Sequence, residues 1–146
     1  MADTVTQHNI GAMITGVTSI FPQSSAAATI NGASIDRAKH NTPLSLDLHT
    51  VVGAVTGAPS AISVVSTLQH APDNATWSAY QPDGANNATA PALTAVSTEN
   101  ELAVDLGGAY RYVRVQTVVG FTGGATPAIS LAAWATFGGE SNLPSI

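Results

Sequence analysis

The sequence has 146 residues and a net charge of -5, with only 9% charged residues and no cysteine. A chain of this length has room for one domain with one sizeable core, and the lack of cysteine excludes disulfides and thiolate metal sites. The four basic residues are too few to neutralise a phosphate backbone, so we expect no nucleic-acid binding. No stretch approaches the roughly 18 apolar residues that span a bilayer, and the start lacks the pattern of a signal peptide. We therefore expect a soluble protein that has no export signal and contacts no membrane.

The low charge also constrains the surface. Average globular proteins contain about 25% charged residues, so the surface of this chain must be built largely from Ser, Thr, Asn, Gln and Ala. Few charges then need to lose their water when a partner docks. Such a surface favours close contact with neighbouring subunits.

Residues 1–25 form a distinct opening segment. Its larger apolar residues match helical spacing better than strand alternation, whereas Gly11, Gly16 and several threonines are poor helix formers. A short amphipathic helix and an extended arm both fit, and the segment either covers one end of the domain's own core or reaches a neighbour. We take its apolar residues as candidates for a docking or oligomerisation surface. They are Ile10, Met13, Ile14, Val17, Ile20 and Phe21.

The next three segments have strand and turn signals. Asn31-Gly32 is a strong hairpin signal, because both central residues of a type I′ turn need positive φ. Residues 44–55 alternate and predict a strand with Leu44, Leu46 and Leu48 facing inward. Residues 62–69 predict a central strand with one face towards the core, followed by a tight turn at residues 72–74. The inward residues of this central strand are Ile62, Val64, Ser66 and Leu68.

The second half of the chain continues the pattern. Residues 81–91 contain no apolar residue larger than alanine and predict a surface loop that is mobile unless something packs on it. Residues 101–106, 110–119 and 129–137 predict three further strands. The fold class is therefore all-β: an antiparallel β-sandwich or jelly roll of about seven to eight strands. We place the sandwich at residues 26–139 and a tail at residues 140–146.

The sequence offers few groups for catalysis or metal binding. The four histidines, at positions 8, 40, 49 and 70, are scattered, and Glu99 and Glu101 share one solvated strand face. Asp73, Asn74 and Asp83 occupy turns, where they are expected to stabilise the turn rather than bind calcium. We therefore predict no catalytic residues, no cofactor and no metal, and a protein that is not an enzyme.

Two arginines on one predicted strand need partners. Arg111 and Arg114 fall on opposite faces, so one of them must reach a buried or end position and pair with an acid such as Asp105 or Asp47. A contact between subunits is the alternative, because aromatic and arginine side chains recur at interfaces. Tyr112 and Arg114 join the candidate partner-binding residues on this ground.

Two short motifs resemble a known class of proteins. The first is LQHAPDNATW, with Leu68, Gln69, His70, Asp73, Thr76 and Trp77, and the second is RYVR, with Arg111, Tyr112, Val113 and Arg114. Together they resemble small β-sandwich proteins encoded with the head genes of tailed bacteriophages, over about residues 35–137. The chain departs from that pattern at Asn74, where glycine is common, and in its apolar opening segment. Similar motifs also occur in discoidin-like carbohydrate-binding domains.

The resemblance implies a virion structural protein, namely a decoration or cement protein on the outer surface of the capsid. Its partner would be the major capsid protein, and the chain would form a homotrimer or homodimer made in the host cytoplasm. One alternative is a carbohydrate-binding module that stacks sugars on Trp134, Tyr80 and Tyr112. Another is a structural subunit of a tail or fibre.

Overall fold

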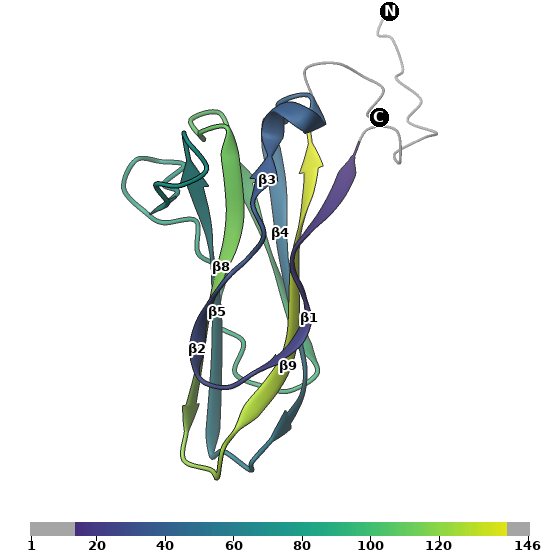
Figure 1. The fold of residues 1–146 in the computed structure, drawn as a ribbon, viewed down its shortest axis with the longest axis vertical. Coiled ribbons are helices and arrows are strands. Elements are labelled where there is room, and N and C mark those ends of the chain that lie inside the picture. The colour runs from purple at the N-terminus through teal and green to yellow at the C-terminus, as the bar shows by residue number, and fades with distance from the viewer. Residues whose placement is uncertain (1–13, 140–146) are drawn as a thin grey trace, which may run out of the picture.

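The computed structural model describes residues 14–139 and is a two-layer antiparallel β-sandwich (Figure 1). One sheet has four strands in the order β1 (Thr15–Ser25), β9 (Ala128–Gly138), β4 (Ser45–Thr56) and β7 (Thr98–Asp105). The other has five strands, with β2 (Ala28–Asn31), β8 (Tyr112–Thr122), β5 (Ala61–Ala71) and β6 (Ser78–Ala79) in that order, and with β3 (Ile35–Asp36) also paired to β8. The predicted all-β class is confirmed. Within the described residues no helix is long and apolar enough to cross a membrane.

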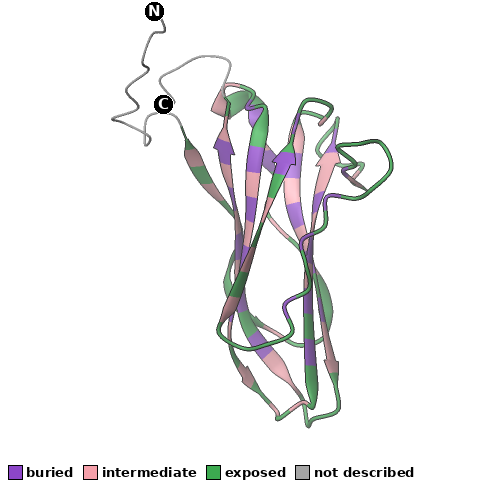
Figure 2. Cartoon of the chain, turned by 180° about the vertical axis from the view of Figure 1, so that it is seen from behind, coloured by how far each residue is buried: buried purple, intermediate pink, exposed green. Residues whose placement is uncertain are grey.

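The core lies between the two sheets and follows the alternation in the sequence (Figure 2). All four inward residues predicted for the strand at residues 62–68 are buried, and so is every second residue of β9 from Ile129 to Phe137. In β4, Leu46 and Leu48 are buried, but Leu44 is 55% exposed. The prediction for Leu44 was wrong because β4 begins at Ser45, so the alternation does not extend to the preceding residue.

The opening segment is part of the sandwich over Thr15–Ser25, where it forms β1 on the edge of the four-stranded sheet. The helical interpretation was wrong for these residues, and the proposed boundary after residue 25 separates β1 from the sheet to which it is bonded. Ile20 is in the core, whereas Ile14 and Phe21 are exposed and Val17 is half-buried. The other two candidates, Ile10 and Met13, lie outside the described residues.

The Asn31-Gly32 hairpin is not formed. Both β2 and β3 pair with the same strand, β8, so the chain continues along one edge instead of reversing. Ser19 of β1 fills the gap between them: its Oγ accepts a hydrogen bond from Val115 N and donates one to Ala33 O, both at 3.0 Å. A Cβ at position 32 would lie 2.2 Å from Ser19 Oγ, so glycine is needed for close approach and not for a turn.

The loop predicted at residues 81–91 is attached to the sandwich in its second half. Leu68 N donates to Ala88 O at 2.9 Å, and Ala90 N donates to Ser66 O at 2.8 Å. Ala88 and Ala90 are buried as a result. The segment therefore covers the edge of β5 beyond β6, and an edge covered in this way cannot pair with another chain.

Candidate functional site

The two motifs that carry the phage resemblance meet in space, because β5 and β8 are neighbouring antiparallel strands. Gln69 lies opposite Arg114, and His70 lies opposite Val113. The turn after β5 then brings Trp77 back over the same end of the sheet, since β6 pairs with residues 69 and 70. We call Gln69, Trp77 and Arg114 the Trp77 cluster.

Arg114 is held at the centre of the Trp77 cluster. Its Nε donates to Gln69 Oε1 at 2.8 Å, and its guanidinium carbon lies 4.3 Å from the centre of the Trp77 ring. Partial burial lowers the pKa of this arginine. Among residues 14–139 no carboxylate forms an ion pair with Arg114. An arginine that is stacked and oriented but not neutralised is a group typical of protein interfaces.

Arg111 has a different partner from those expected. Its Nε and Nη2 donate to the two carboxylate oxygens of Asp36, at 2.9 and 2.7 Å. This two-point bond is the main cause of a lowered pKa for Asp36 and a raised pKa for Arg111. The prediction of Asp105 or Asp47 as the partner was wrong, because Asp36 on β3 is directly opposite Tyr112 on β8, one residue from Arg111.

Three rings pack together at the end of β5, where His70 projects from the face of the strand opposite to Gln69. His70 stacks on Tyr110 with 4.4 Å between ring centres, and its Nδ1 accepts a hydrogen bond from Tyr110 N at 3.2 Å. Tyr80 lies on the other side of His70 at 4.9 Å and donates its hydroxyl to Asp105 O at 2.8 Å. Burial, with the nearby charge of Arg37, lowers the pKa of His70. Tyr110 is 50% exposed and extends the aromatic surface to solvent.

The turn that positions Trp77 is closed by Asp73. Its Oδ1 accepts hydrogen bonds from Ala75 N at 2.9 Å and Thr76 N at 2.7 Å, and its Oδ2 accepts one from Thr76 Oγ1 at 2.8 Å. Asn74 has φ of 58°, which explains why glycine fits this position and why asparagine is tolerated. The expected turn-stabilising role of the aspartate is confirmed.

The same turn is built a second time ten residues later, from Pro82 onward. Asp83 Oδ1 accepts from Ala85 N and Asn86 N, and Asp83 Oδ2 accepts from Asn86 Nδ2. Gly84 occupies the position of positive φ, at 73°. The two Pro-Asp-x-Ala turns thus have the same hydrogen-bond pattern, with asparagine at the position of positive φ in the first turn and glycine in the second.

The turn at Asp73 predicts a pH dependence. Its three hydrogen bonds lower the pKa of Asp73 from 3.8 to about 2. A lowered pKa means that the carboxylate stabilises the fold fully above the unfolded value and loses this contribution as the pH falls towards 2. We expect Asp73→Asn to lower the stability measured by urea unfolding at pH 6, with a much smaller difference from wild type at pH 2.5. If Asp73→Asn lowered the stability by the same amount at both pH values, the Asp73 carboxylate would not be the source of the pH dependence.

The three aromatic residues proposed to stack sugars do not form one platform. Tyr80 is 2% exposed and belongs to the core. Trp134 is on β9 of the four-stranded sheet, whereas Tyr112 is on β8 of the other sheet and lies 5.1 Å from the guanidinium of Arg111. A sugar ring could therefore stack on at most one of them at a time.

A second polar group lies on the outer face of the four-stranded sheet. Asp47 and His49 are two residues apart on β4, and Glu101 on β7 is directly opposite His49. One ligand-type atom from each of the three side chains lies within 4.8 Å of the others. We call these residues the Asp47 cluster. The sequence predicts His49 as a scattered histidine and Glu101 as a partner of Glu99 on one solvated strand face, because it does not show that β4 and β7 are paired.

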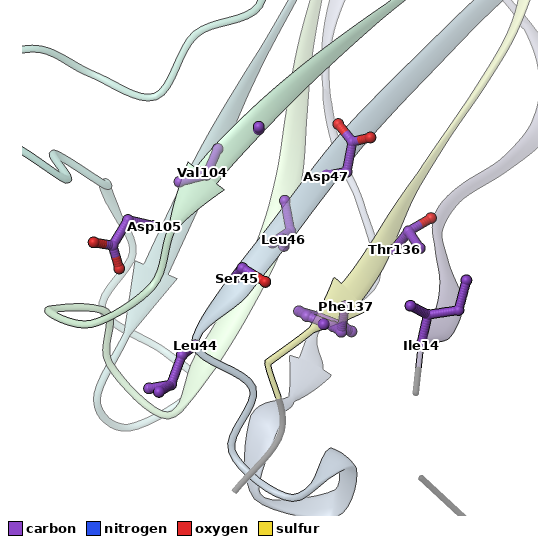
Figure 3. Close-up of a pocket in the computed structure, with 11 residues that line it drawn as sticks. Ile14, Leu44, Ser45, Leu46, Asp47, Val104, Asp105, Thr136 and Phe137 are labelled. Carbon is purple, nitrogen blue, oxygen red and sulfur yellow. The ribbon is translucent and has the colours of Figure 1, made fainter. Parts of the chain in front are cut away.

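An apolar hollow of about 650 Å³ adjoins the Asp47 cluster at the end of the four-stranded sheet (Figure 3). It is lined by residues from β4, β7 and β9 and by Ile14, just before β1. Of the apolar residues that line it, Ile14 is 42% exposed and Leu44 is 55% exposed. Ile14, one of the predicted docking residues, and the exposed Leu44 therefore lie on opposite sides of this hollow.

No protein-family model and no curated protein match the sequence. Among solved structures, the chain is similar to the SPBc2 prophage-derived protein YomS, with 13% identity over 84% of this chain and 92% of that one and a TM-score of 0.43. It is also similar to a chain from Bacillus endospore appendages, described as a novel family of disulfide-linked pili, with 10% identity over 88% and 90% of the two chains and a TM-score of 0.43. At these values, the sandwich assignment rests on the strand pairing of this chain, and its function has to be inferred from its own residues.

Proposed function

We propose that this protein is a non-enzymatic structural component of a tailed-phage virion that binds the outer surface of the capsid and stabilises it. The observation that carries the proposal is the Trp77 cluster: the residues of the two phage-like motifs, far apart in the sequence, form one oriented arginine and aromatic group. Its partner is the major capsid protein, and copies of the chain associate as a trimer or dimer to match the symmetry of the shell.

The composition of the surface supports the same proposal. With 9% charged residues, the sandwich can be covered by neighbouring subunits at low desolvation cost. Phe21 on the edge strand β1 is 65% exposed, and exposed aromatic residues are frequent anchors of interfaces. Binding that occurs only to the assembled shell shifts the assembly equilibrium towards that shell, which is how a decoration protein stabilises a capsid.

Three buried hydroxyl groups bond to one another. Ser66 bonds to the hydroxyls of Thr50 and Thr117, each at 2.7 Å, and not to an imidazole or carboxylate that could remove its proton. The His70 imidazole accepts a backbone hydrogen bond at Nδ1 and contacts two tyrosine rings.

Co-sedimentation with capsids that lack the protein tests the proposal. We expect saturable binding at a fixed ratio to the major capsid protein and a higher temperature of shell disruption. Replacement of Arg114 by alanine is expected to weaken binding by about tenfold or more, as for interface residues of this type. Arg111→Ala is the matched control, since this arginine is two-point bonded to Asp36 and should change binding by less than about twofold.

One outcome would contradict the proposal, and a second would contradict only the docking surface assigned to it. If the protein does not bind mature capsids, a tail or glycan-binding role takes its place. If capsids bind but Arg114→Ala and Arg111→Ala behave alike, the decoration role stands and the Trp77 cluster is not the docking surface. In that case Phe21→Ser tests the exposed edge of β1 next.

A further inference from the structure

We propose that the Asp47 cluster binds one divalent transition-metal ion, of which Zn²⁺ is the representative probe, through Asp47, His49 and Glu101. This site is independent of the proposed docking surface, because it lies on the outer face of the four-stranded sheet and the Trp77 cluster belongs to the other sheet.

The backbone places the three side chains without distortion. Residues two apart on a strand project from the same face, so Asp47 and His49 are neighbours along β4. The register of β4 and β7 puts Glu101 directly beside His49. Two strands of one rigid sheet therefore supply all three groups, and no loop has to close around the ion.

The distances suit a small cation. His49 Nε2 lies 3.2 Å from Asp47 Oδ2. Ligands of a tetrahedral zinc ion, each about 2.0 to 2.1 Å from the metal, are about 3.3 Å from one another. The first two ligand atoms already have this spacing, and the third lies within 4.8 Å of both, a gap that rotation of the exposed Glu101 side chain can close.

The other carboxylate oxygen of Asp47 lacks a hydrogen-bond partner. The Asp47 side chain is 38% exposed, but its Oδ1 atom is buried and accepts no hydrogen bond within the described structure. An ion bound by both carboxylate oxygens would give Oδ1 a partner. A buried carboxylate oxygen without a donor is costly. Residue 103, next to Asp47 on β7, is alanine, so no longer side chain from that strand occupies the space beside the carboxylate.

Trp134 holds the imidazole ring of His49 in one orientation. Trp134 on β9 is opposite His49, and the two rings stack with 5.2 Å between centres and 9° between planes. Figure 3 shows Asp47 beside Thr136 on the same side of the sheet, one alternation further along β9. A histidine held in one orientation loses little freedom when it binds a metal.

The donor set selects the class of ion. Imidazole nitrogen with two carboxylates suits zinc, nickel or copper, whereas calcium and magnesium prefer oxygen ligands alone. Three protein ligands on an exposed face leave a fourth position for water. We therefore expect Zn²⁺ to bind more tightly than Ca²⁺ or Mg²⁺ at this site.

Calorimetric titration of the full chain with ZnCl₂ at pH 7.5 tests the inference. We expect one Zn²⁺ per chain, and about tenfold or greater loss of affinity in His49→Gln and in Glu101→Gln. Glu99→Gln is the matched control, because Glu99 is on the same strand, is exposed and faces the same side, but lies opposite Val51 and not His49. This variant should retain the affinity of the wild type within about twofold.

A spectroscopic readout locates the ion. Zn²⁺ should shift the indole N–H resonance of Trp134 and leave that of Trp77 unchanged, since only Trp134 stacks on His49. The inference is overturned if the heat of zinc binding does not saturate during the titration, or if His49→Gln binds zinc with the affinity of the wild type. It is also overturned if Glu99→Gln weakens zinc binding as much as Glu101→Gln does. Circular dichroism of each variant shows whether it is folded, and Glu101→Gln changes only an exposed side chain.

Discussion

Replacing Arg37 by methionine is expected to lower the free energy of unfolding by about 3 to 5 kcal/mol, although no acidic residue within residues 14–139 forms an ion pair with this arginine. Its side chain is 4% exposed and donates four hydrogen bonds to backbone carbonyls. Nη1 donates to Ala109 O at 2.6 Å and Tyr110 O at 3.0 Å, and Nη2 donates to Pro43 O at 2.7 Å and Leu106 O at 3.1 Å. Methionine fills a similar volume but leaves these carbonyls without their donor.

The positive charge of Arg37 strengthens each of these hydrogen bonds, but removing that charge from water costs solvation free energy. The protein holds this cation away from water, and this burial lowers the pKa of Arg37. Removing the charge recovers part of that cost, so the net loss is smaller than the sum of four charged hydrogen bonds. The bonds join the 3-10 helix η2 (Arg37–His40) to the loop that carries Tyr110, the ring that stacks on His70.

Urea unfolding followed by tryptophan fluorescence measures the effect. Arg37→Lys is an informative second variant, because it retains the charge but offers donors from one nitrogen only and cannot span the same four carbonyls. We expect it to be less stable than the wild type and more stable than Arg37→Met. Arg111→Met, on the exposed surface, controls for loss of an arginine. A change below about 1 kcal/mol for Arg37→Met would show that the carbonyls find water instead.

The contrast between Arg37 and the strands shows what local sequence can predict. Alternation in β4, β5 and β9 identified the core because every second side chain of a strand faces the same way. Arg37 instead lies in a short basic stretch that has no strand alternation. Its burial depends on carbonyls near residue 109, more than seventy positions away, so no local pattern could reveal it.

The helical interpretation of the opening segment was wrong for a different reason. The pairing of β1 with β9 has register shifts between Thr18 and Ile20 and between Ile20 and Gln23. A bulge breaks the two-residue alternation, so Ser19 and Ile20 are both buried although they are adjacent. The resulting spacing of three between Val17 and Ile20 imitates a helix. The threonines and glycines that argued against a helix gave the more reliable signal.

The Asp47 cluster and the Trp77 cluster were predictable to different degrees. Leu68 to Trp77 and Arg111 to Arg114 were recognised as motifs, and their neighbouring strands then brought Gln69 to Arg114. Asp47 and His49 share a strand face in the sequence alone, but Glu101 joins them only through the register of β4 with β7. Register between strands that are distant in the chain is the information that alternation lacks.

A chain of three buried hydroxyls predicts a second large effect on stability. Thr50 on β4 donates to Ser66 on β5, which bonds in turn to Thr117 on β8, so the chain crosses from one sheet to the other. All three residues are at most 1% exposed. We expect Ser66→Ala to lower the free energy of unfolding by about 2 kcal/mol, because it leaves the hydroxyls of Thr50 and Thr117 buried without their shared partner.

Because the cost arises from the hydroxyls left behind, removing all three should recover much of it. We expect the triple variant Thr50→Val, Ser66→Ala and Thr117→Val to lie within about 1 kcal/mol of the wild type and to be more stable than Ser66→Ala alone. A double-mutant cycle on Ser66 and Thr117, measured by urea unfolding, gives the coupling directly. If the three single losses simply add in the triple variant, the hydroxyls act independently. If they couple as expected, the two sheets are joined by one polar network whose members stabilise the fold only together.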